Sequence, residues 1–347
     1  MTINKKIRVL VVDDSALVRK ILINGMSKDP EINVIGEASN PYIARDLMVE
    51  LEPDVITLDV EMPRMDGVTF LKKFMAVMPT PTIIISSLTQ HGKQITLDAL
   101  AAGAVDIIAK PVIGLVDGLP LLVDDINARI KAAAAIDVAK LHRTHPVIVD
   151  VPTSLHETTD HLIAIGSSTG GVEALSRIMP AFPADSAGIV IVQHMPAGFT
   201  STFAERLNNS CKMRVKEAQD GDRIMQGQVL LAPGGMLHTT VIRSGGQYRI
   251  ALKEGDEVNY SRPSVDVMFH SVAKAAGRNV AAAILTGMGK DGAAGLKAIQ
   301  QAGGKTFAQD EATCIVFGMP QVAISLGAAD KIAPLEKIPN LLINSFN

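Results

Sequence analysis

Carboxylic acids follow two of the short apolar runs in the first third of the chain. Asp13 and Asp14 come directly after IRVLVV, and Asp59 follows VITL. Because ligands of open parallel sheets bind outside the carboxyl ends of the strands, these three side chains are expected to share one sheet edge. Carboxylates held together repel one another unless a hard cation lies between them. The pattern therefore predicts a Mg²⁺ site formed by Asp13, Asp14 and Asp59.

A hydroxyl and an ammonium group end two further apolar runs of the same region. Ser86 ends TIIIS, and Lys110 follows VDIIA. A phosphoryl group carried by one of the aspartates would need a hydrogen-bond donor and a cation of this kind beside it. Each residue taken alone is more typical of a solvated loop or a helix cap. The set as a whole favours a shared phosphoryl site.

A glycine-rich turn, GSSTGG at residues 166–171, follows the apolar run LIAI in the second half. One interpretation is a phosphate cradle, since such a turn presents N–H groups and the positive end of a helix dipole. The turn lacks both the GxGxxG spacing and a GK[ST] sequence, which weakens that interpretation. The other interpretation is that the turn raises Ser168 above the sheet as a nucleophile.

A nucleophilic serine needs a base and a group that orients the base. His194 ends the next apolar strand, GIVIVQHMP, and Asp291 lies in the turn MGKDGAAG after VAAAILTG. All three residues are expected at the same sheet edge, and the glycines near Asp291 would let main-chain N–H groups form an oxyanion hole. A lone histidine at such a place is as often structural as catalytic.

The elements that would position these residues alternate between strands and helices. The expected strands of the first half are at residues 7–12, 33–38, 54–60, 82–87 and 105–109, and those of the second half are at 162–168, 188–195 and 280–287. Alternation with helical segments predicts parallel sheets with right-handed crossovers. Residues 235–253 alternate around an SGGQ turn, which is typical of an antiparallel hairpin. Both halves are therefore predicted to be α/β.

A segment rich in proline and threonine divides the two halves. After a helix expected to end near Ala139, the stretch LHRTHPVIVDVPTSLHETTD has no apolar period and is predicted to be a linker. The expected boundaries are a first domain at 1–130, a linker at 131–160 and a second domain at 161–347. A chain of 347 residues agrees with two domains.

Composition excludes several classes of partner. The formal net charge of −3, with 33 basic residues that form no block, indicates neither nucleic-acid binding nor an anionic membrane surface. No apolar run approaches the ~20 residues that span a bilayer, so a cytoplasmic location is expected.

The two cysteines, Cys211 and Cys314, form no CxxC pattern and are expected to be buried apolar residues.

The first half resembles response-regulator receiver domains in VVDDSALVRK, LDVEMPRMDGV, IIISS and AKP, in order and spacing. The resemblance implies a 2-1-3-4-5 parallel sheet, with Mg²⁺ on Asp13, Asp14 and Asp59. It also implies Asp59 as the residue phosphorylated by a histidine kinase, and Ser86 and Lys110 as the pair that senses the phosphoryl group. Ile107 stands where many receivers have an aromatic switch residue, so switching through that residue is not expected.

The second half is similar to chemotaxis protein-glutamate methylesterases, the CheB family, in IGSSTGG, VQHMP, LLAPGG, RPSVDVMF and LTGMGKDG. The resemblance implies Ser168 as nucleophile, His194 as general base and acid, and Asp291 as the orienting carboxylate. The Met288 N–H becomes the oxyanion donor, with the Thr169 hydroxyl in support. The family usually has alanine before the nucleophile, whereas this chain has Ser167, which leaves two candidate serines.

The resemblance further implies hydrolysis of γ-glutamyl methyl esters on the cytoplasmic helices of chemoreceptors, with deamidation of receptor glutamines as a second activity and no cofactor for either. An unphosphorylated receiver is expected to inhibit the esterase, because a linker keeps both sites at high effective concentration. Arg262 is a candidate substrate contact, although an exposed basic start to an amphipathic core helix is the favoured explanation. A monomer is expected.

Two other functions stay open from the sequence. A response regulator without enzymatic activity would use its second half to bind a partner or a nucleotide, although no basic helix-turn-helix supports DNA binding. A hydrolase of small esters or amides would keep the same catalytic residues, because the geometry of a site transfers between substrates more readily than its specificity.

Overall fold

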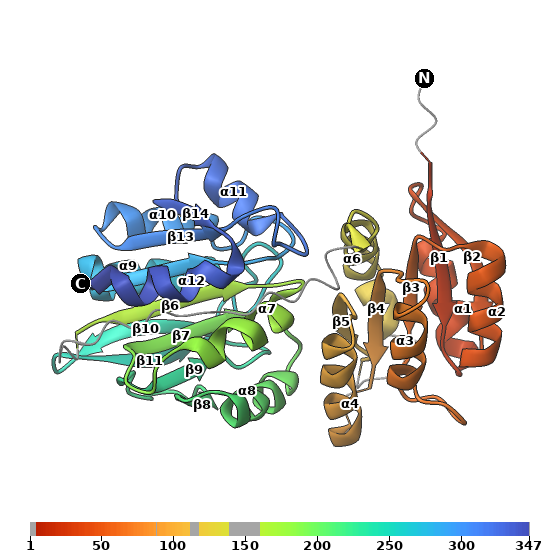
Figure 1. The fold of residues 1–347 in the computed structure, drawn as a ribbon, viewed down its shortest axis with the longest axis horizontal. Helices are drawn as coiled ribbons and strands as arrows, with labels where there is room; N and C mark the ends of the chain where they lie inside the picture. Colours follow the sequence, from red (N-terminus) through yellow and green to blue (C-terminus); the bar gives the residue numbers. More distant parts are fainter. Residues whose placement is uncertain (1–4, 88, 112–117, 139–159, 347) are drawn as a thin grey trace. The chain divides into compact units, whose positions relative to one another are not determined.

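The computed structural model describes residues 5–87, 89–111, 118–138 and 160–346, and these fall into two compact units, one within residues 1–143 and one within 144–347 (Figure 1). Most of the predicted linker, residues 139–159, lies outside the described residues. In the described ranges, no helix has both the length and the apolar character that a membrane span requires.

The first unit is a five-stranded parallel sheet with the order β2-β1-β3-β4-β5. Helix α1 contacts α6, whereas α2, α3 and α4 contact one another in turn, as expected for helices that cover the two faces of a doubly wound sheet. The strands are β1 Ile7–Val12, β2 Ile32–Ala38, β3 Val55–Leu58, β4 Thr82–Ser86 and β5 Asp106–Ala109. The helices are α1 Ala16–Met26, α2 Pro41–Leu51, α3 Gly67–Met75, α4 Gln90–Ala101, η1 Leu119–Leu122 and α6 Val123–Ala134.

All five predicted strands of the first unit and their order are confirmed. The end of the last helix differs from the prediction: α6 stops at Ala134, before the expected Ala139. The helix is amphipathic over its whole length and buries Ile126, Ile130 and Ala133, so packing against the sheet, and not the alanine-rich composition that follows, sets its extent.

A seven-stranded parallel sheet forms the second unit, with the order β14-β13-β12-β6-β7-β9-β8. Its strands are β6 Leu162–Ser167, β7 Gly188–Gln193, β8 Arg214–Glu217, β9 Gln228–Leu231, β12 Val280–Ile284, β13 Lys305–Gln309 and β14 Lys331–Ala333. The helices are α7 Gly171–Ile178, η3 Met179–Ala181, α8 Phe199–Ser210, α9 Val265–Ala276, η4 Gly277–Asn279, α10 Ala293–Gln301, α11 Met319–Ser325, η5 Leu335–Lys337, α12 Ile338–Ile343 and η6 Asn344–Phe346.

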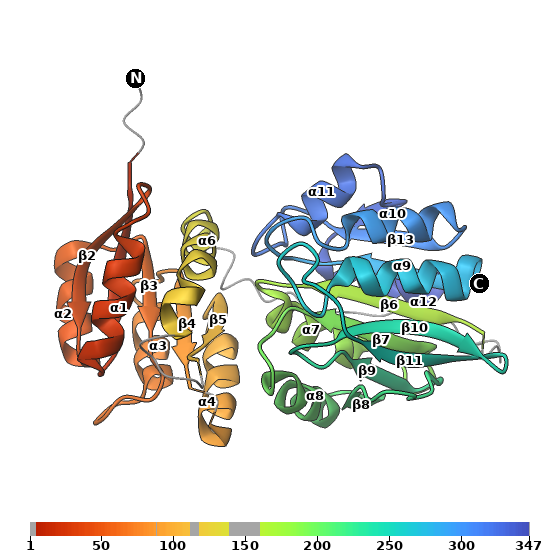
Figure 2. The same cartoon turned by 180° about the vertical axis from the view of Figure 1, so that it is seen from behind.

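The predicted hairpin is present as β10 His238–Ser244 and β11 Gln247–Lys253, joined at Gly245 and Gly246. Helix α9 packs against this hairpin and against α10 on one face of the sheet, while α7 and α12 lie on the other face (Figures 1 and 2). The core of the unit joins Val190 of β7, Tyr248 of β11 and Phe269 of α9. The hairpin therefore serves as a cover for α9 and not as part of the main sheet.

The two cysteines differ in burial. Cys314 is fully buried, as expected, whereas Cys211 at the end of α8 is half-buried, so the expectation of a buried residue is wrong there. Burial raises the pKa of the Cys211 thiol to about 11, which keeps it protonated at neutral pH.

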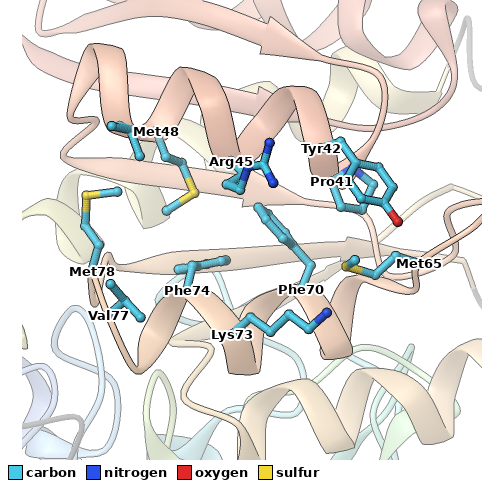
Figure 3. Close-up of a pocket in the computed structure, with 11 residues that line it drawn as sticks. Pro41, Tyr42, Arg45, Met48, Met65, Phe70, Lys73, Phe74, Val77 and Met78 are labelled. Atoms are coloured by element: carbon cyan, nitrogen blue, oxygen red, sulfur yellow. The ribbon is translucent and has the colours of Figure 1, made fainter.

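An apolar groove of about 420 Å³ runs between α2 and α3 of the first unit (Figure 3). Phe70 and Phe74 point into it from α3 and Met48 from α2, and the charged residues that line it, Arg45 and Lys73, are both basic.

Candidate active site

The three acidic residues of the first unit converge as predicted. Asp13 and Asp14 follow β1, Asp59 follows the neighbouring strand β3, and carboxylate oxygens from all three lie within 4.8 Å of one another. Lys110 Nζ lies 2.8 Å from Asp13 Oδ2 and 2.6 Å from Asp59 Oδ2. Three carboxylates are the oxygen donors that a hard divalent cation prefers, so the residues present fit a Mg²⁺ ion.

Burial determines the charge state of this acidic cluster. Asp59 is 3% exposed, and its burial raises its pKa to about 6 although the Lys110 ammonium acts in the opposite direction. Burial also raises the pKa of Asp13. Burial alone would lower the pKa of Lys110, but attraction to Asp59 and Asp13 outweighs burial and raises it, so the lysine stays charged.

Ser86 is fully buried at the end of β4, and its Oγ lies 3.4 Å from the carbonyl oxygen of Ser87. The Lys110 N–H donates to the Ser86 carbonyl at 2.7 Å, so the chain segments carrying these two predicted residues are joined directly. Ile107 is buried in β5 and pairs with Ile84 in the register of the sheet. An aliphatic core residue therefore occupies the position where many receivers carry an aromatic switch.

A contact between two loops beside Asp59 was not predicted. Glu61, in the loop after β3, accepts hydrogen bonds from the hydroxyls of Ser87 and Thr89, and the Thr89 bond measures 3.0 Å. The Glu61 N–H donates to Asp59 Oδ1 at 3.1 Å. Nothing in the spacing of these residues indicates their pairing, because it depends on the approach of two loops from adjacent strands.

The two serines of the GSSTGG turn have different environments. Ser167 is fully buried, and its hydroxyl donates to Gln193 Oε1 at 2.6 Å. Gln193 Nε2 in turn donates to the carbonyls of Ser168 and His194, each at 2.9 Å. Ser168 Oγ has no hydrogen-bond partner among the residues that the structure describes, and the residue is 9% exposed. The hydroxyl of Ser167 is therefore engaged in a structural hydrogen bond, whereas that of Ser168 is available to react.

The turn itself depends on two glycines. Gly170 has φ +79°, in the left-handed region that favours glycine. A Cβ at Gly171 would lie 2.1 Å from Gln193 Oε1 and 2.7 Å from Ser167 Cβ, closer than any real contact. The turn can thus pass from β6 into α7 over the Ser167–Gln193 bond only because residue 171 has no side chain.

His194 and Asp291 are brought together as predicted. His194 Nε2 lies 2.9 Å from Asp291 Oδ2, and the two side chains are 10% and 2% exposed. Burial acts to raise the pKa of Asp291, but hydrogen bonds and attraction from His194, with hydrogen bonds from Ser264 and Asn259, outweigh burial and lower it. Asp291 is therefore an ionised carboxylate that orients the imidazole.

Further donors that the sequence did not identify hold Asp291. Ser264 Oγ donates to Oδ1 at 2.7 Å, the Val265 N–H to Oδ2 at 2.6 Å, the Asp266 N–H to Oδ1 at 3.2 Å and Asn259 Nδ2 to Oδ1 at 3.1 Å. Ser264 is also the N-cap of α9. A serine before an apolar helical stretch could have been identified as a cap, but its contact with Asp291 crosses 27 positions of sequence.

Ser168 and His194 follow neighbouring strands, although no hydrogen bond joins Ser168 Oγ to His194 within the described parts of the chain. Ser167 pairs with Gln193 in the sheet register, so Ser168 and His194 leave neighbouring strands at the same level. On the other side, the Ser168 N–H donates to the Thr286 carbonyl at 3.0 Å. The second ring nitrogen of His194, Nδ1, lies 3.3 Å from Ser261 Oγ.

The predicted oxyanion donors lie next to Ser168. A Cβ on Gly287 would lie 2.7 Å from Ser168 Cβ, so the loop carrying Met288 passes directly against the serine. The Met288 N–H has no acceptor among the described residues and remains available for a ligand. Thr169 is 5% exposed, and its carbonyl accepts a 2.9 Å hydrogen bond from the Thr286 hydroxyl.

Arg262, the candidate substrate contact, precedes α9 and is turned toward its own loop. Its Nη1 donates to the Gly255 carbonyl at 2.7 Å, and its Nη2 lies 3.3 Å from Met236 Sδ. The residue therefore contributes to the shape of the loop beside His194.

Two family descriptions match the chain. CheB methylesterase matches residues 163–342, which contain Ser168, His194 and Asp291, and the response regulator receiver domain matches residues 9–115, which contain the acidic cluster.

Two relatives resemble almost the whole chain, and one solved structure resembles about half of it. The protein-glutamate methylesterase/protein-glutamine glutaminase of Syntrophotalea carbinolica is 53% identical over 345 residues, 98% of each chain. Protein-glutamate methylesterase/protein-glutamine glutaminase 2 of Pseudomonas aeruginosa is 51% identical over 97% of this chain and 96% of its own. The crystal structure of the Thermotoga maritima CheB methylesterase catalytic domain is 42% identical, with a TM-score of 0.52 over 53% of this chain and 97% of that one. With a receiver ahead of its catalytic domain, the chain belongs to the CheB methylesterase family.

Proposed function

We propose that this protein is a phosphorylation-controlled protein-glutamate methylesterase that hydrolyses γ-glutamyl methyl esters on chemoreceptors and serves sensory adaptation in chemotaxis. The observation that carries the proposal is the His194–Asp291 pair of 2.9 Å at the sheet edge where Ser168 follows β6, with His194 directly after β7 and Asp291 in the loop after β12. The names of the relatives supply the ester of a protein glutamate as substrate. Deamidation of receptor glutamines is the second activity.

The reaction follows from the hydrogen bonds of the imidazole. The Asp291 carboxylate can only accept, so Nε2 of His194 carries the proton between them and Nδ1 is the basic nitrogen. Ser168 Oγ attacks the ester carbonyl while Nδ1 takes its proton. The negative charge of the tetrahedral intermediate is stabilised by the Met288 N–H, with Thr169 beside it. The proton then passes from Nδ1 to the departing methoxide, which leaves as methanol.

Water completes the cycle. It attacks the acyl-serine while His194 Nδ1 takes one of its protons, and Ser168 leaves with that proton as the glutamate is released. With a glutamine side chain the first leaving group is ammonia, and the product is the same glutamate. The residues of this site need no cofactor for either reaction.

The receiver supplies the control. Asp59 accepts a phosphoryl group from a histidine kinase, and Ser86 and Lys110 contact that group. Asp13, Asp14 and Asp59 would hold Mg²⁺, which neutralises phosphoryl oxygens during the transfer. We propose further that the unphosphorylated receiver inhibits the esterase, that the domains are 1–130 and 161–347 with the linker between them, and that the protein works as a cytoplasmic monomer.

The test is methanol release from membranes that carry methyl-labelled receptor, with the intact protein, Mg²⁺ and a small phosphodonor. Wild type is expected to release methanol and Ser168→Ala none. Ser176→Ala, a serine on α7 whose hydroxyl donates to the Val172 carbonyl, is the matched control and should retain activity. Release from small esters but not from methylated receptor would contradict the proposed substrate, and release by Ser168→Ala would contradict the mechanism.

A further inference from the structure

The loop between β11 and α9 places a hydroxyl on the catalytic histidine. Ser261 Oγ lies 3.3 Å from His194 Nδ1, on the side of the ring opposite Asp291. Val258 and Ser261 exchange two backbone hydrogen bonds of 3.2 and 3.1 Å, which close a tight turn. Asn259 and Tyr260 within this turn have φ of 53° and 61°, an uncommon conformation for residues other than glycine. Ser261 is thus presented by a well-defined turn.

Contacts on both sides hold this loop in place. His238 Nε2 lies 2.8 Å from the Asp256 carbonyl, and its Nδ1 accepts a 3.1 Å hydrogen bond from the Ser264 N–H, so Nε2 is the donor. Arg262 donates to the Gly255 carbonyl, and Asn259 Nδ2 donates to Asp266 Oδ2 at 2.8 Å. The position of Ser261 relative to His194 is therefore fixed by several independent bonds.

The direction of the Ser261 contact follows from the ring's other partner. Because Nε2–H donates to Asp291, Nδ1 of the neutral ring has a lone pair, and the hydroxyl facing it must donate. We propose that Ser261 is a positioning residue of the esterase, which holds His194 Nδ1 at the nucleophile's side of the ring. The inference rests on the proposed function of this site.

A hydroxyl suits both charge states that His194 passes through. Before acylation, the Ser261 O–H donates to the Nδ1 lone pair and restrains rotation of the ring until Ser168 engages the same nitrogen. After the proton transfer, Nδ1 carries a hydrogen, and the same hydroxyl can turn to accept from it. Ser261 thereby accepts a hydrogen bond from the imidazolium while Ser168 Oγ forms its bond to the ester carbonyl carbon. Ser261 itself exchanges no proton with the substrate.

The experiment compares full-length wild type, Ser261→Ala and Ser261→Thr in methanol release from methyl-labelled receptor membranes, with Mg²⁺ and phosphodonor. We expect Ser261→Ala to lower kcat about tenfold, the effect of one lost hydrogen bond to a charged group, with KM unchanged. Ser261→Thr restores the hydroxyl and should recover most of the rate. Glu257→Gln, an exposed residue of the same loop, is the control and should leave kcat unchanged.

Each other outcome contradicts the proposal in a recognisable way. An unchanged kcat in Ser261→Ala would show that the hydroxyl does not position His194 for the reaction. A change confined to KM would indicate that Ser261 contacts the substrate instead. A loss of kcat together with a lower melting temperature, not recovered by threonine, would mean that the residue is merely structural. If wild type itself releases no methanol, the esterase proposal fails first, and this inference fails with it.

Discussion

Two neighbouring serines, Ser167 and Ser168, differ in what their hydroxyls contact, and this difference separates stability from activity. Removing the Ser167 hydroxyl leaves the buried Gln193 Oε1 without its donor, so Ser167→Ala should lower the free energy of unfolding by about 1–3 kcal/mol. Ser168→Ala should abolish methanol release without that loss, because its Oγ has no partner among the described residues. Thermal unfolding and methanol release, measured on both variants, check these two expectations. An inactive Ser167→Ala and a destabilised, active Ser168→Ala would show that Ser167 is the nucleophile.

Asp291 determines which nitrogen of His194 is basic. Asp291→Asn would present an amide where the ring needs an acceptor, and we expect kcat to fall by a factor on the order of 10³–10⁴, as in other triads that lose the carboxylate. Methanol release at saturating receptor measures this. A loss smaller than tenfold would show that another group orients the ring.

The lowered pKa of Asp291 predicts how stability depends on pH. A carboxyl whose folded pKa lies below its ordinary value of about 3.9 stabilises the fold fully above that value, and the contribution is lost as pH falls through the folded pKa. The stability difference between wild type and Asp291→Asn should therefore shrink as pH is lowered below about 4. Denaturant unfolding of both proteins at pH 7 and at pH 3 measures this difference, and a constant difference would contradict the lowered pKa of Asp291.

At the scale of elements, the β6–α7 turn has no room for a side chain at residue 171. Alanine normally stabilises a helix more than glycine does. Gly171→Ala should nevertheless destabilise the second unit, because the new Cβ would lie 2.1 Å from Gln193 Oε1. Gly245→Ala in the hairpin turn is the control: it meets open space at φ +57° and should cost only about 1–2 kcal/mol of backbone strain. Melting temperatures of the two variants should differ, and equal values would show that the turn can relax.

The strands that carry site residues could be predicted from sequence, and several others could not. β6, β7 and β12 are central, so they are buried on both faces and appear as continuous apolar runs. β8 is an edge strand with the sequence RVKE, and β14 at the other edge has three residues, so neither has that pattern. β9 and β13 were also missed, since the short runs QVLL and KTFAQ are ambiguous without their neighbours.

The residues of the candidate site also divide into those that the sequence predicts and those that it does not. Ser168 and His194 directly follow β6 and β7, and Asp291 lies in the loop after β12, so the order of these neighbouring strands predicts that all three residues lie at one edge of the sheet. Gln193, Ser261 and Asn259 act through contacts between loops, which no spacing in the sequence encodes.

In the whole molecule, phosphorylation of Asp59 should be the step by which the receiver stimulates the esterase. Asp59→Asn is expected to keep the basal rate of methanol release and to lose all stimulation by a small phosphodonor, because no acyl phosphate can form. Chelation of Mg²⁺ should have the same effect on wild type. Asp46→Asn, an exposed aspartate paired with Arg45 on α2, is the control and should respond normally. Stimulation that persists in Asp59→Asn would place control elsewhere.

The β10–β11 hairpin lies between the proposed catalytic residues in the order of the chain. Ser168 and His194 precede the turn at Gly245 and Gly246, and Asp291 follows it, while the turn itself is exposed with open space around both glycines. Exposed loop tips of this kind tolerate new chain ends. A polypeptide divided there would give two fragments, neither of which carries the complete triad. Methanol release would then report the reassembly of the fragments, which makes this turn the natural place to build a split enzyme.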